Sequence, residues 1–479
     1  MDRFAISACS ILLLAACGAG DTTPTATLAS SSAATTATQS KTGGSTRSVP
    51  ATSTARDPGP RAGLAGAGAP LAGLTTHELT AFNIGKEDFN EEEGVPDGLG
   101  PRMNLDGCGG CHSQPAIGGT SPAINPQVAF AAKESATNVV PSFLSLNGPI
   151  REARFVNKPD GSPDGGVQAL FTITGRSDAT ADCQIAQPDF AAAVAARNVI
   201  FRIPTPVFGA GLMEQIPDRA ILANLASNAQ AKQRLGIRGH ANRPAPPSVS
   251  GLGNSNGNDG TISRFGWKAQ NKSMLLFSGE AYNVEMGISN HLFQTERDET
   301  EACQYLATPN SVTDLAAATL QEGLSSIEKF ANFMRFLAAP VASTDSPGGA
   351  ASIASGKALF TDVGCALCHT PTLRTGPATV VALGGQDVNL FSDLLVHDMG
   401  EGLADGVSQG TATGREFRTA PLWGLGQRLF FLHDGRTSDL QAAVQQHASS
   451  GSEANATVSK FNALSDSQEQ DLLNFLRSL

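Results

Sequence analysis

The sequence Cys108-Gly109-Gly110-Cys111-His112 decides how the rest of the chain is interpreted, because C-x-x-C-H is the spacing at which c-type haem is attached. Two thiols at this spacing can add to the two vinyl groups of one porphyrin, and the adjacent histidine then binds the iron as its axial ligand. The pattern recurs at Cys365-Ala366-Leu367-Cys368-His369. One such match arises by chance in roughly a few chains per thousand, and two arise far more rarely. The sequence therefore predicts two covalently bound haem c groups. The alternative is a zinc-binding or redox-active C-x-x-C pair that happens to precede a histidine.

The two haem-attachment sequences lie in stretches that resemble each other over a longer distance. Each follows a Gly-Lys sequence that ends in phenylalanine, and each precedes Phe-Arg and then Pro-x-aromatic-Gly-x-Gly. The matching segments are 85–89 with 356–360, 201–202 with 417–418, and 206–211 with 421–426. This order indicates a duplicated domain. We expect a mainly α fold of two class I cytochrome c-like domains, the first enlarged by loop-rich insertions with a few short strands.

Composition divides the 479 residues into segments, and this length suits two or three domains. We expect a signal peptide at 1–17 and a disordered tether rich in Ala, Ser, Thr and Pro at 18–70. The N-terminal haem domain then covers 71–340, a linker covers 341–353, and the C-terminal haem domain covers 354–479. The clearest helices are expected from a capping box at Thr75 to Phe89, over about 313–338, through 356–360, and after a cap at Ser465.

The N-terminus has the features of an exported lipoprotein. Arg3 precedes an apolar stretch, and Leu14-Ala15-Ala16-Cys17 resembles a bacterial lipobox. Cys17 would then carry a lipid anchor, whereas an ordinary signal peptide cut near Ala19 is the alternative. We expect a periplasmic protein anchored to a bacterial membrane, with the outer membrane favoured. No later stretch reaches the ~18 apolar residues of a transmembrane helix.

The eight cysteines can be assigned one by one. Cys9 lies in the signal peptide, Cys17 is the lipid site, and four belong to the haem motifs. Cys183 and Cys303 remain, and an even remainder in an oxidising compartment predicts a disulfide bond. Two separate buried thiols are the alternative.

The charge balance restricts the partners. The formal net charge is -11 and only 16% of residues are charged. Nucleic acid and anionic membrane surfaces both attract basic patches, so neither is an expected partner. An acidic surface permits docking of a basic electron donor, and we expect a small electron-donor protein or a quinol-linked chain.

Several further stretches carry a resemblance to a known family. The chain from about Leu71 to Leu479 resembles the di-haem oxidoreductase family, a peroxidase-type group also described as thiol oxidoreductase-like, and more distantly the bacterial di-haem cytochrome c peroxidases. The stretches that carry it are 97–101, 115–119, 208–217 (FGAGLMEQIP), 264–270 (RFGWKAQ), 285–288 (EMGI), 392–400 (SDLLVHDMG) and 431–436 (FLHDGR). The resemblance is specific for family and much less specific for reaction. It also leaves open a calcium ion between the two haem domains.

The resemblance suggests the sixth ligand of the second haem. In the peroxidases a His-Asp-Gly segment is followed, after a short helix, by this ligand, which is often methionine. Here the matching order after His433-Asp434-Gly435 leads to His447. We therefore expect His369 and His447 to coordinate the second iron, with Met399 as the rival.

The first haem has no histidine at the equivalent place, where Lys232 stands. Its sixth position is then open, or filled by Met286, His291 or His240. The resembling peroxidases supply a distal histidine soon after the first motif, and no histidine lies between His112 and His240 in this chain.

The resemblance also suggests residues around the haems. Glu214 stands where the resembling peroxidases carry an active-site carboxylate, so it is the candidate for a distal acid/base. A solvated glutamate is the alternative. Arg202 and Arg418 follow a phenylalanine in both copies and are candidates to pair with haem propionates, the alternative being solvated arginines. Trp267 or Trp423 could lie between the haems as a path for electrons, although core packing is the commoner role of a tryptophan.

The function expected from these features is that of a lipid-anchored di-haem oxidoreductase. Electrons enter at the C-terminal haem and pass to the N-terminal haem, where a small oxidant such as hydrogen peroxide is reduced. Two alternatives remain. One is an electron-transfer lipoprotein without catalysis, linked for example to iron uptake, and the other is an oxygenase of an apolar substrate, as in related rubber oxygenases.

Overall fold

A computed structural model describes residues 54–243 and 262–479 of the chain. The expected signal peptide, Cys17 and most of the expected tether lie outside these residues. These described residues belong to one compact unit. Helices carry most of its regular structure and the strands form small sheets, which agrees with a mainly α fold.

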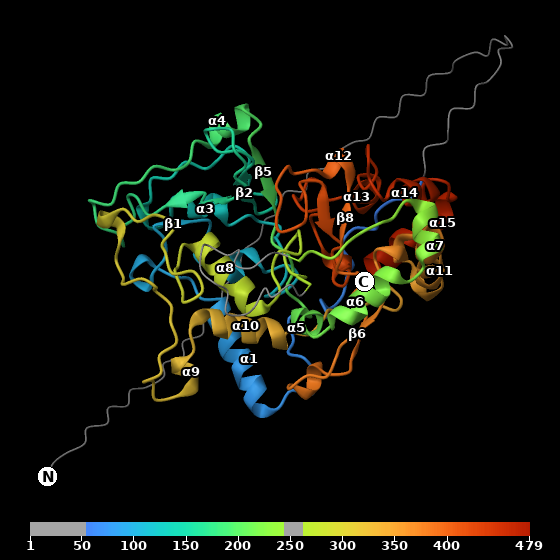
Figure 1. Ribbon diagram of the computed structural model, residues 1–479, viewed down its shortest axis with the longest axis horizontal. Coiled ribbons are helices and arrows are strands. Elements are labelled where there is room, and N and C mark those ends of the chain that lie inside the picture. The colour runs from blue at the N-terminus through green and yellow to red at the C-terminus, as the bar shows by residue number, and fades with distance from the viewer. Residues whose placement is uncertain (1–53, 244–261) are drawn as a thin grey trace, which may run out of the picture. The chain divides into compact units, whose positions relative to one another are not determined.

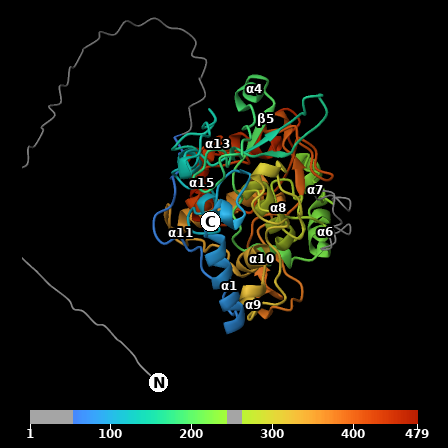
Figure 2. The same ribbon diagram turned by 90° about the vertical axis from the view of Figure 1, so that its left-hand side faces the viewer.

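Two helix pairs organise this unit, and Figures 1 and 2 show the first of them with α1 beside α10. Each pair joins a helix that precedes a C-x-x-C-H sequence to a helix that ends the corresponding part of the chain. The four helices are α1 (Thr76–Phe89) with α10 (Ser326–Phe336), and α11 (Gly349–Val363) with α15 (Asp466–Ser478).

A glycine sits at each helix crossing. A Cβ atom on Gly85 would lie 2.2 Å from the carbonyl oxygen of Lys329, and one on Gly356 would lie 2.0 Å from that of Asp471. Only glycine allows backbones to approach this closely. These two glycines begin the matching segments 85–89 and 356–360, so the repeat seen in the sequence corresponds to a repeated helix crossing.

Four expected helices can be compared with the structure. The capping boxes at Thr75 and Ser465 are confirmed. The helix expected over 313–338 is shorter, because Ser325 is extended and forms its own capping box with Glu328 at the start of α10. The helix expected through 356–360 begins earlier, at Gly349, so the last part of the expected linker 341–353 is helical.

The expectation of a disordered tether through residue 70 is wrong for the residues from 54 onward. Asp57 forms an ion pair of 2.6 Å with the buried Arg477 in α15, and it accepts a hydrogen bond of 2.8 Å from the backbone N–H of Leu440. Ala55 is buried. Sequence composition missed this, because the partners lie more than 380 residues away along the chain.

The segment between the two motifs contains short strands, as expected, and one long helix that was not expected. Helix α8 (Met274–Met286) is buried over much of its surface, and its polar residues are not gathered on one face, so it has little helical periodicity. The remaining helices are α2 (Cys108–Cys111), α3 (Gln127–Phe130), α4 (Phe190–Ala195), α5 (Ala210–Glu214), α6 (Asp218–Ala226), α7 (Ala229–Leu235), α9 (Leu320–Gly323), α12 (Gly400–Leu403), α13 (Leu440–Gln445) and α14 (Asn455–Phe461). Short 3-10 helices cover Val95–Asp97, Lys133–Ser135, Glu301–Cys303, Cys365–Leu367, Val381–Leu383 and Leu425–Gln427.

The sheets are antiparallel and hold the two Phe-Arg sequences. Strand β2 (Glu152–Phe155) lies between β3 (Val167–Gln168) and β5 (Val199–Arg202), with Glu152 opposite Arg202. Strand β8 (Val396–Asp398) pairs with β9 (Glu416–Arg418), with Val396 opposite Arg418. The other pairs are β1 (Arg102–Met103) with β4 (Phe171–Thr172) and β6 (Leu373–Arg374) with β7 (Asp387–Val388). Among the described helices, none is both long and apolar enough to cross a membrane.

Candidate functional site

The first C-x-x-C-H sequence lines a cavity of about 1160 Å³, which we call the first cavity. The short helix α2 brings Cys108 and Cys111 to its wall, and His112 follows directly. Phe89 from α1 lies edge-on to the His112 ring, with the ring centroids 6.0 Å apart.

The imidazole of His112 is oriented by the backbone. Its Nδ1 lies 2.9 Å from the carbonyl oxygen of Gly119, which can only accept a hydrogen bond, so Nδ1 carries the proton. Burial lowers the pKa of His112 and keeps the ring neutral. The backbone of Thr205 is a second hydrogen-bond partner of the ring, and Nε2 can bind a metal only in its unprotonated form.

The second C-x-x-C-H sequence repeats this arrangement in a cavity of about 1380 Å³, the second cavity. Cys365, Cys368 and His369 line it, and His369 Nδ1 lies 3.0 Å from the carbonyl oxygen of Phe391. Burial, together with the charge of His447, lowers the pKa of His369 to about 4. Both motifs thus present a neutral histidine that is bonded through Nδ1.

His447 lines the second cavity and, like His112 and His369, is bonded through Nδ1 to a backbone carbonyl. Its Nδ1 lies 2.7 Å from the carbonyl oxygen of Ala443 in α13, and burial lowers its pKa. His397 also lines this cavity, but its ring nitrogens contact Asp393 at 2.9 Å and Glu453 at 2.8 Å, so neither is free for a metal. Met399 lies in the same wall, so both expected candidates reach the second cavity.

The state of the cysteines fits this arrangement. Cys183 and Cys303 form a disulfide bond, which confirms the pairing expected from the sequence. The four cysteines of the two motifs are free thiols, and burial raises the pKa of Cys108, Cys111 and Cys365, the last to about 12. Each cavity is therefore lined by the two thiols of a C-x-x-C pair, which is the sequence spacing at which thiols add to the two vinyl groups of one porphyrin.

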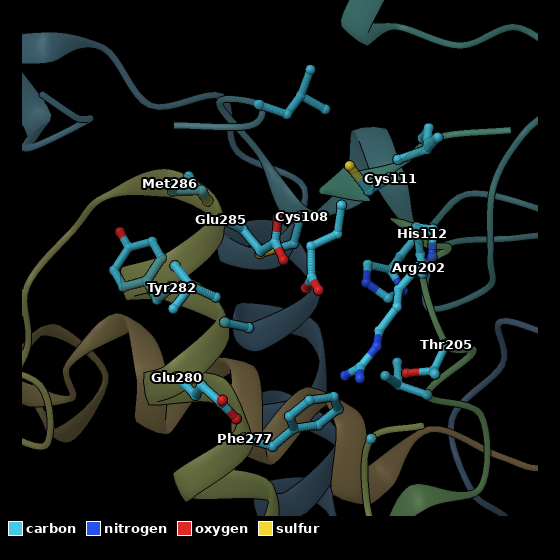
Figure 3. A pocket seen from close by; sticks show the side chains of 18 of the residues that line it. Cys108, Cys111, His112, Arg202, Thr205, Phe277, Glu280, Tyr282, Glu285 and Met286 are labelled. Atoms are coloured by element: carbon cyan, nitrogen blue, oxygen red, sulfur yellow. The ribbon is translucent and has the colours of Figure 1, made fainter. Parts of the chain in front are cut away.

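Helix α8 forms the wall of the first cavity that faces His112 and Arg202 (Figure 3). It presents Glu280, Glu285 and Met286 to the cavity. The first cavity is thus lined by carboxylates from this helix, and the second is lined by His447 in addition to the histidine of its motif. Of these residues only Met286 was a candidate from the sequence, and no sequence pattern indicated that the carboxylates of Glu280 and Glu285 line a cavity.

The carboxylates of the first cavity have different protonation states. Burial raises the pKa of Glu285 well above its usual range, and the neighbouring Glu152 raises it further. Burial acts on Glu152 in the same direction, but Arg154 and a hydrogen bond from Glu285 overcome it and lower the pKa of Glu152. Glu285 is thus the protonated member of the pair and donates to the Glu152 carboxylate. Burial also raises the pKa of Glu280.

Glu214, the expected acid/base, does not line either cavity. Its carboxylate forms an ion pair of 2.7 Å with Arg335 and accepts a hydrogen bond of 2.8 Å from the N–H of Met274, at the start of α8. The expectation for Glu214 is therefore corrected: the side chain positions α8 against α10. The sequence match aligned the residue, but the side chain is turned to these partners.

The candidates for the sixth position of the first haem separate clearly. Met286 lines the first cavity. His240 lies outside it, with Nε2 2.9 Å from Glu416, and His291 lies outside it as well. Met286 is the one of the three that the structure brings to the cavity.

The two expected propionate partners both line their cavities, but they differ. Arg202 forms an ion pair of 2.9 Å with Asp405 and donates to Gln409 at 2.6 Å, and its Nε has no partner. Arg418 donates only to carbonyl oxygens, those of Gly266 at 2.9 Å and Thr419 at 3.3 Å. Arg428 also lines the second cavity, although the sequence analysis did not single it out.

Trp267 lines both cavities. Its indole N–H donates a hydrogen bond of 2.9 Å to the carbonyl oxygen of Ile203, which fixes the ring in place. Trp423 lines neither of the two cavities. It packs near Gly209, where a Cβ atom would lie 2.6 Å from its ring. Of the two tryptophans, Trp267 therefore has the position expected for an electron path.

The residues present fit a haem in each cavity. Each cavity combines two free thiols, a histidine bonded through Nδ1, a mainly apolar lining and a buried arginine, which is ion-paired with Asp405 in the first cavity and bonded only to carbonyl oxygens in the second. Within residues 54–243 and 262–479, no group of three or more His, Cys, Asp or Glu side chains is arranged to hold a bare metal ion.

Comparison with known proteins supports the same cofactor. The model of a protein family described as "Di-haem oxidoreductase, putative peroxidase" matches residues 152–479, more than half of the chain, which confirms the resemblance stated from the sequence. A solved structure of hydrazine synthase from Kuenenia stuttgartiensis, pressurised with xenon, is similar at 19% identity and a TM-score of 0.21. That match covers 32% of this chain and 55% of the synthase chain. No curated protein matches this chain.

Proposed function

Because this chain belongs to the di-haem oxidoreductase family, we propose that it reduces a small oxidant, such as hydrogen peroxide, at the first cavity with electrons received at the second. The observation that carries the proposal is the difference between the cavities. The second is lined by His369 and His447, two candidate ligands, whereas the first is lined by one histidine, which faces carboxylates. An iron with two protein ligands suits electron transfer, and an iron with a free position suits chemistry.

Each cavity with its helix pair is, in this proposal, one cytochrome c-like domain. Cys108 and Cys111 bind the first haem covalently and His112 ligates its iron. Cys365 and Cys368 bind the second, and its iron is held by His369 and His447. The shared Nδ1 bonding of these three histidines supports the assignment.

When bound, the haems supply the one-electron chemistry, and the protein supplies protons and access. Reduction of hydrogen peroxide to two water molecules consumes two electrons and two protons. Glu285 holds a proton in its hydrogen bond to Glu152, and both carboxylates line the first cavity. We assign Glu285 as the proton donor to the bound oxidant, with Glu152 as its partner.

Trp267 is proposed as the path between the two haems. It lines both cavities and is held rigidly by its bond to Ile203. An aromatic ring at this position shortens the distance that an electron has to cross between the cofactors.

The cellular setting is proposed from the sequence alone. The lipobox that ends at Cys17 supports a lipid anchor on the periplasmic side of a bacterial membrane, and the two haem motifs need export. The net charge of -11 supports a basic electron-donor protein, with a quinol-linked chain as the other source of electrons.

A second candidate function is electron transfer without catalysis. It is favoured by Met286, whose thioether lines the first cavity and could occupy the sixth position of the first iron. Both irons would then have two protein ligands.

Spectroscopy of the purified holoprotein separates the two functions. Reduction of peroxide requires a high-spin component that changes on addition of peroxide or cyanide, measured by electron paramagnetic resonance and optical absorption at several redox states. Two purely low-spin haems that react with neither ligand would refute the peroxidase-type function and support the carrier.

Substitution of the proposed proton donor tests the mechanism. Glu285→Gln keeps the size of the side chain and removes the acid, so peroxide turnover falls by about 10² to 10⁴ while the low-spin signal of the second haem is unchanged. Glu87→Gln, on the exposed side of α1, is the matched control and leaves turnover unchanged. Equal turnover in both variants would contradict the assignment of Glu285.

A further inference from the structure

Two buried arginines near the second cavity lack the partners that other buried arginines have. Arg418 ends strand β9, and Arg428 follows the 3-10 helix Leu425–Gln427. Their residues are 7% and 8% exposed. Both line the second cavity and also a smaller neighbouring cavity of about 480 Å³, which we call the junction cavity.

The other largely buried arginines of the described chain provide an internal comparison. Each of them is matched by a carboxylate on the protein: Arg154 by Glu152, Arg176 by Asp178, Arg202 by Asp405, Arg264 by Asp218 and Arg477 by Asp57. Arg418 donates only to neutral carbonyl oxygens, and Nε and Nη2 of Arg428 have no partner. Among the fully buried arginines of residues 54–243 and 262–479, the other five are thus paired with acids, and these two are not.

Two unmatched positive charges in one buried place need an anion. Burying a charge without a partner is costly, and two like charges add repulsion to that cost. The pKa of each arginine agrees with this: burial lowers that of Arg428 to about 10, and burial together with the charge of Arg428 lowers that of Arg418 to about 10. A carboxylate suits the site, because it can accept two parallel hydrogen bonds from a guanidinium.

We propose that Arg418 and Arg428 together bind a propionate carboxylate of the haem attached at Cys365 and Cys368. This inference rests on the proposed function only in requiring a haem in the second cavity. It adds Arg428 to the site and directs the propionate edge of that haem toward the junction cavity and Trp267, whose ring centroid lies 5.9 Å from the Arg428 guanidinium carbon.

The two arginines would change the reduction potential of the second haem. A positive charge beside the cofactor favours the reduced form and raises its reduction potential. In the first cavity the corresponding Arg202 is already neutralised by Asp405. Arg418 and Arg428 therefore place two positive charges without an ion-paired carboxylate beside the second cavity, and both also line the junction cavity together with Trp267.

The test measures the reduction potential of the low-spin haem in the purified holoprotein by optical redox titration. Arg428→Gln removes one charge, and we expect the equilibrium between oxidised and reduced haem to shift toward oxidised by about tenfold, which is about 59 mV for a one-electron couple. Arg428→Lys keeps the charge, so we expect its reduction potential to lie close to that of the wild-type protein. Arg374→Gln, at an exposed arginine paired with Asp387, is the control and leaves it unchanged.

The outcomes are distinguishable from those of the proposed function. An unchanged potential in both Arg428→Gln and Arg418→Gln, with haem still covalently attached, would overturn the inference even if peroxide is reduced. A potential that changes on adding or removing acetate would also overturn it, because the anion would then be exchangeable and not a propionate. If the wild-type protein has no peroxidase activity, the proposed function fails, but the expected shift in the reduction potential of the low-spin haem in Arg428→Gln would still be observed.

Discussion

The ion pair between Asp57 and Arg477 gives the most direct test of how the N-terminal segment is held. Arg477 is 1% exposed, and Asp57 contacts it through two bonds of 2.7 and 2.6 Å. Asp57→Ala removes the carboxylate and leaves the guanidinium buried without its acid. Breaking a buried pair in this way destabilises a protein by about 3 to 5 kcal/mol.

The expected change in melting temperature follows from the size of the unit. For a unit of roughly 430 residues the entropy of unfolding is about 0.9 kcal/mol/K, so this loss lowers the melting temperature by about 3 to 6 °C. Differential scanning calorimetry of the holoprotein measures it. Thr54→Ala, which removes an exposed hydrogen bond to Asp466 in the same segment, is the control and shifts the melting temperature by less than about 1 °C.

A double substitution separates the charge from the packing. Asp57→Leu combined with Arg477→Met replaces the pair by apolar side chains, and we expect it to recover most of the stability lost in Asp57→Ala. The hydrogen bonds from Arg477, Leu440 and Gly59 overcome the effect of burial and lower the pKa of Asp57. Its contribution is therefore complete above the unfolded pKa of about 3.9 and is lost as the pH falls through the lower folded value. A melting temperature that is unchanged in Asp57→Ala would refute this account of the segment.

Other predictions concern the disulfide bond, the axial ligand and the electron path. Cys183→Ser combined with Cys303→Ser removes a cross-link across 120 residues, and chain entropy predicts a loss of about 5 kcal/mol in the free energy of unfolding. Calorimetry measures this loss, and a value below about 1 kcal/mol would contradict the entropic estimate. His447→Ala abolishes the low-spin resonance of the second haem while haem staining of the denatured protein is unchanged, and if Met399→Ala does this instead, His447 is not the ligand. Trp267→Phe slows electron transfer between the haems by about tenfold, which corresponds to an increase of about 1.4 kcal/mol in the barrier. Rapid mixing with a reductant measures the rate, and an unchanged rate would exclude the indole from the path.

Several features could be predicted from the sequence because they depend on residues close together along the chain. The spacing in Cys108 to His112 and its copy identified both cavities. The caps at Thr75 and Ser465 began helices where expected. The pairing of Cys183 with Cys303 followed from counting, since the other cysteines had assigned roles.

Other features depended on contacts that no local pattern contains. Helix α8 has little periodicity because it is buried on several sides, so neither the helix nor the carboxylates it presents could be placed from the sequence. Glu214 was aligned with a family position, yet Arg335 and Met274 hold its side chain away from the cavities. A family alignment gives the position of a residue in the chain and not the direction of its side chain.

The sequence by itself determined where two thiols and a histidine stand at the spacing that covalent haem attachment requires, since that spacing is a local property of the chain. Only the tertiary structure decided what surrounds each attachment point. Opposite His112 it brought Glu285, and beside His369 it brought His447 and Arg428. These partners come from segments distant in the chain, and burial changes their charges only after the fold has formed.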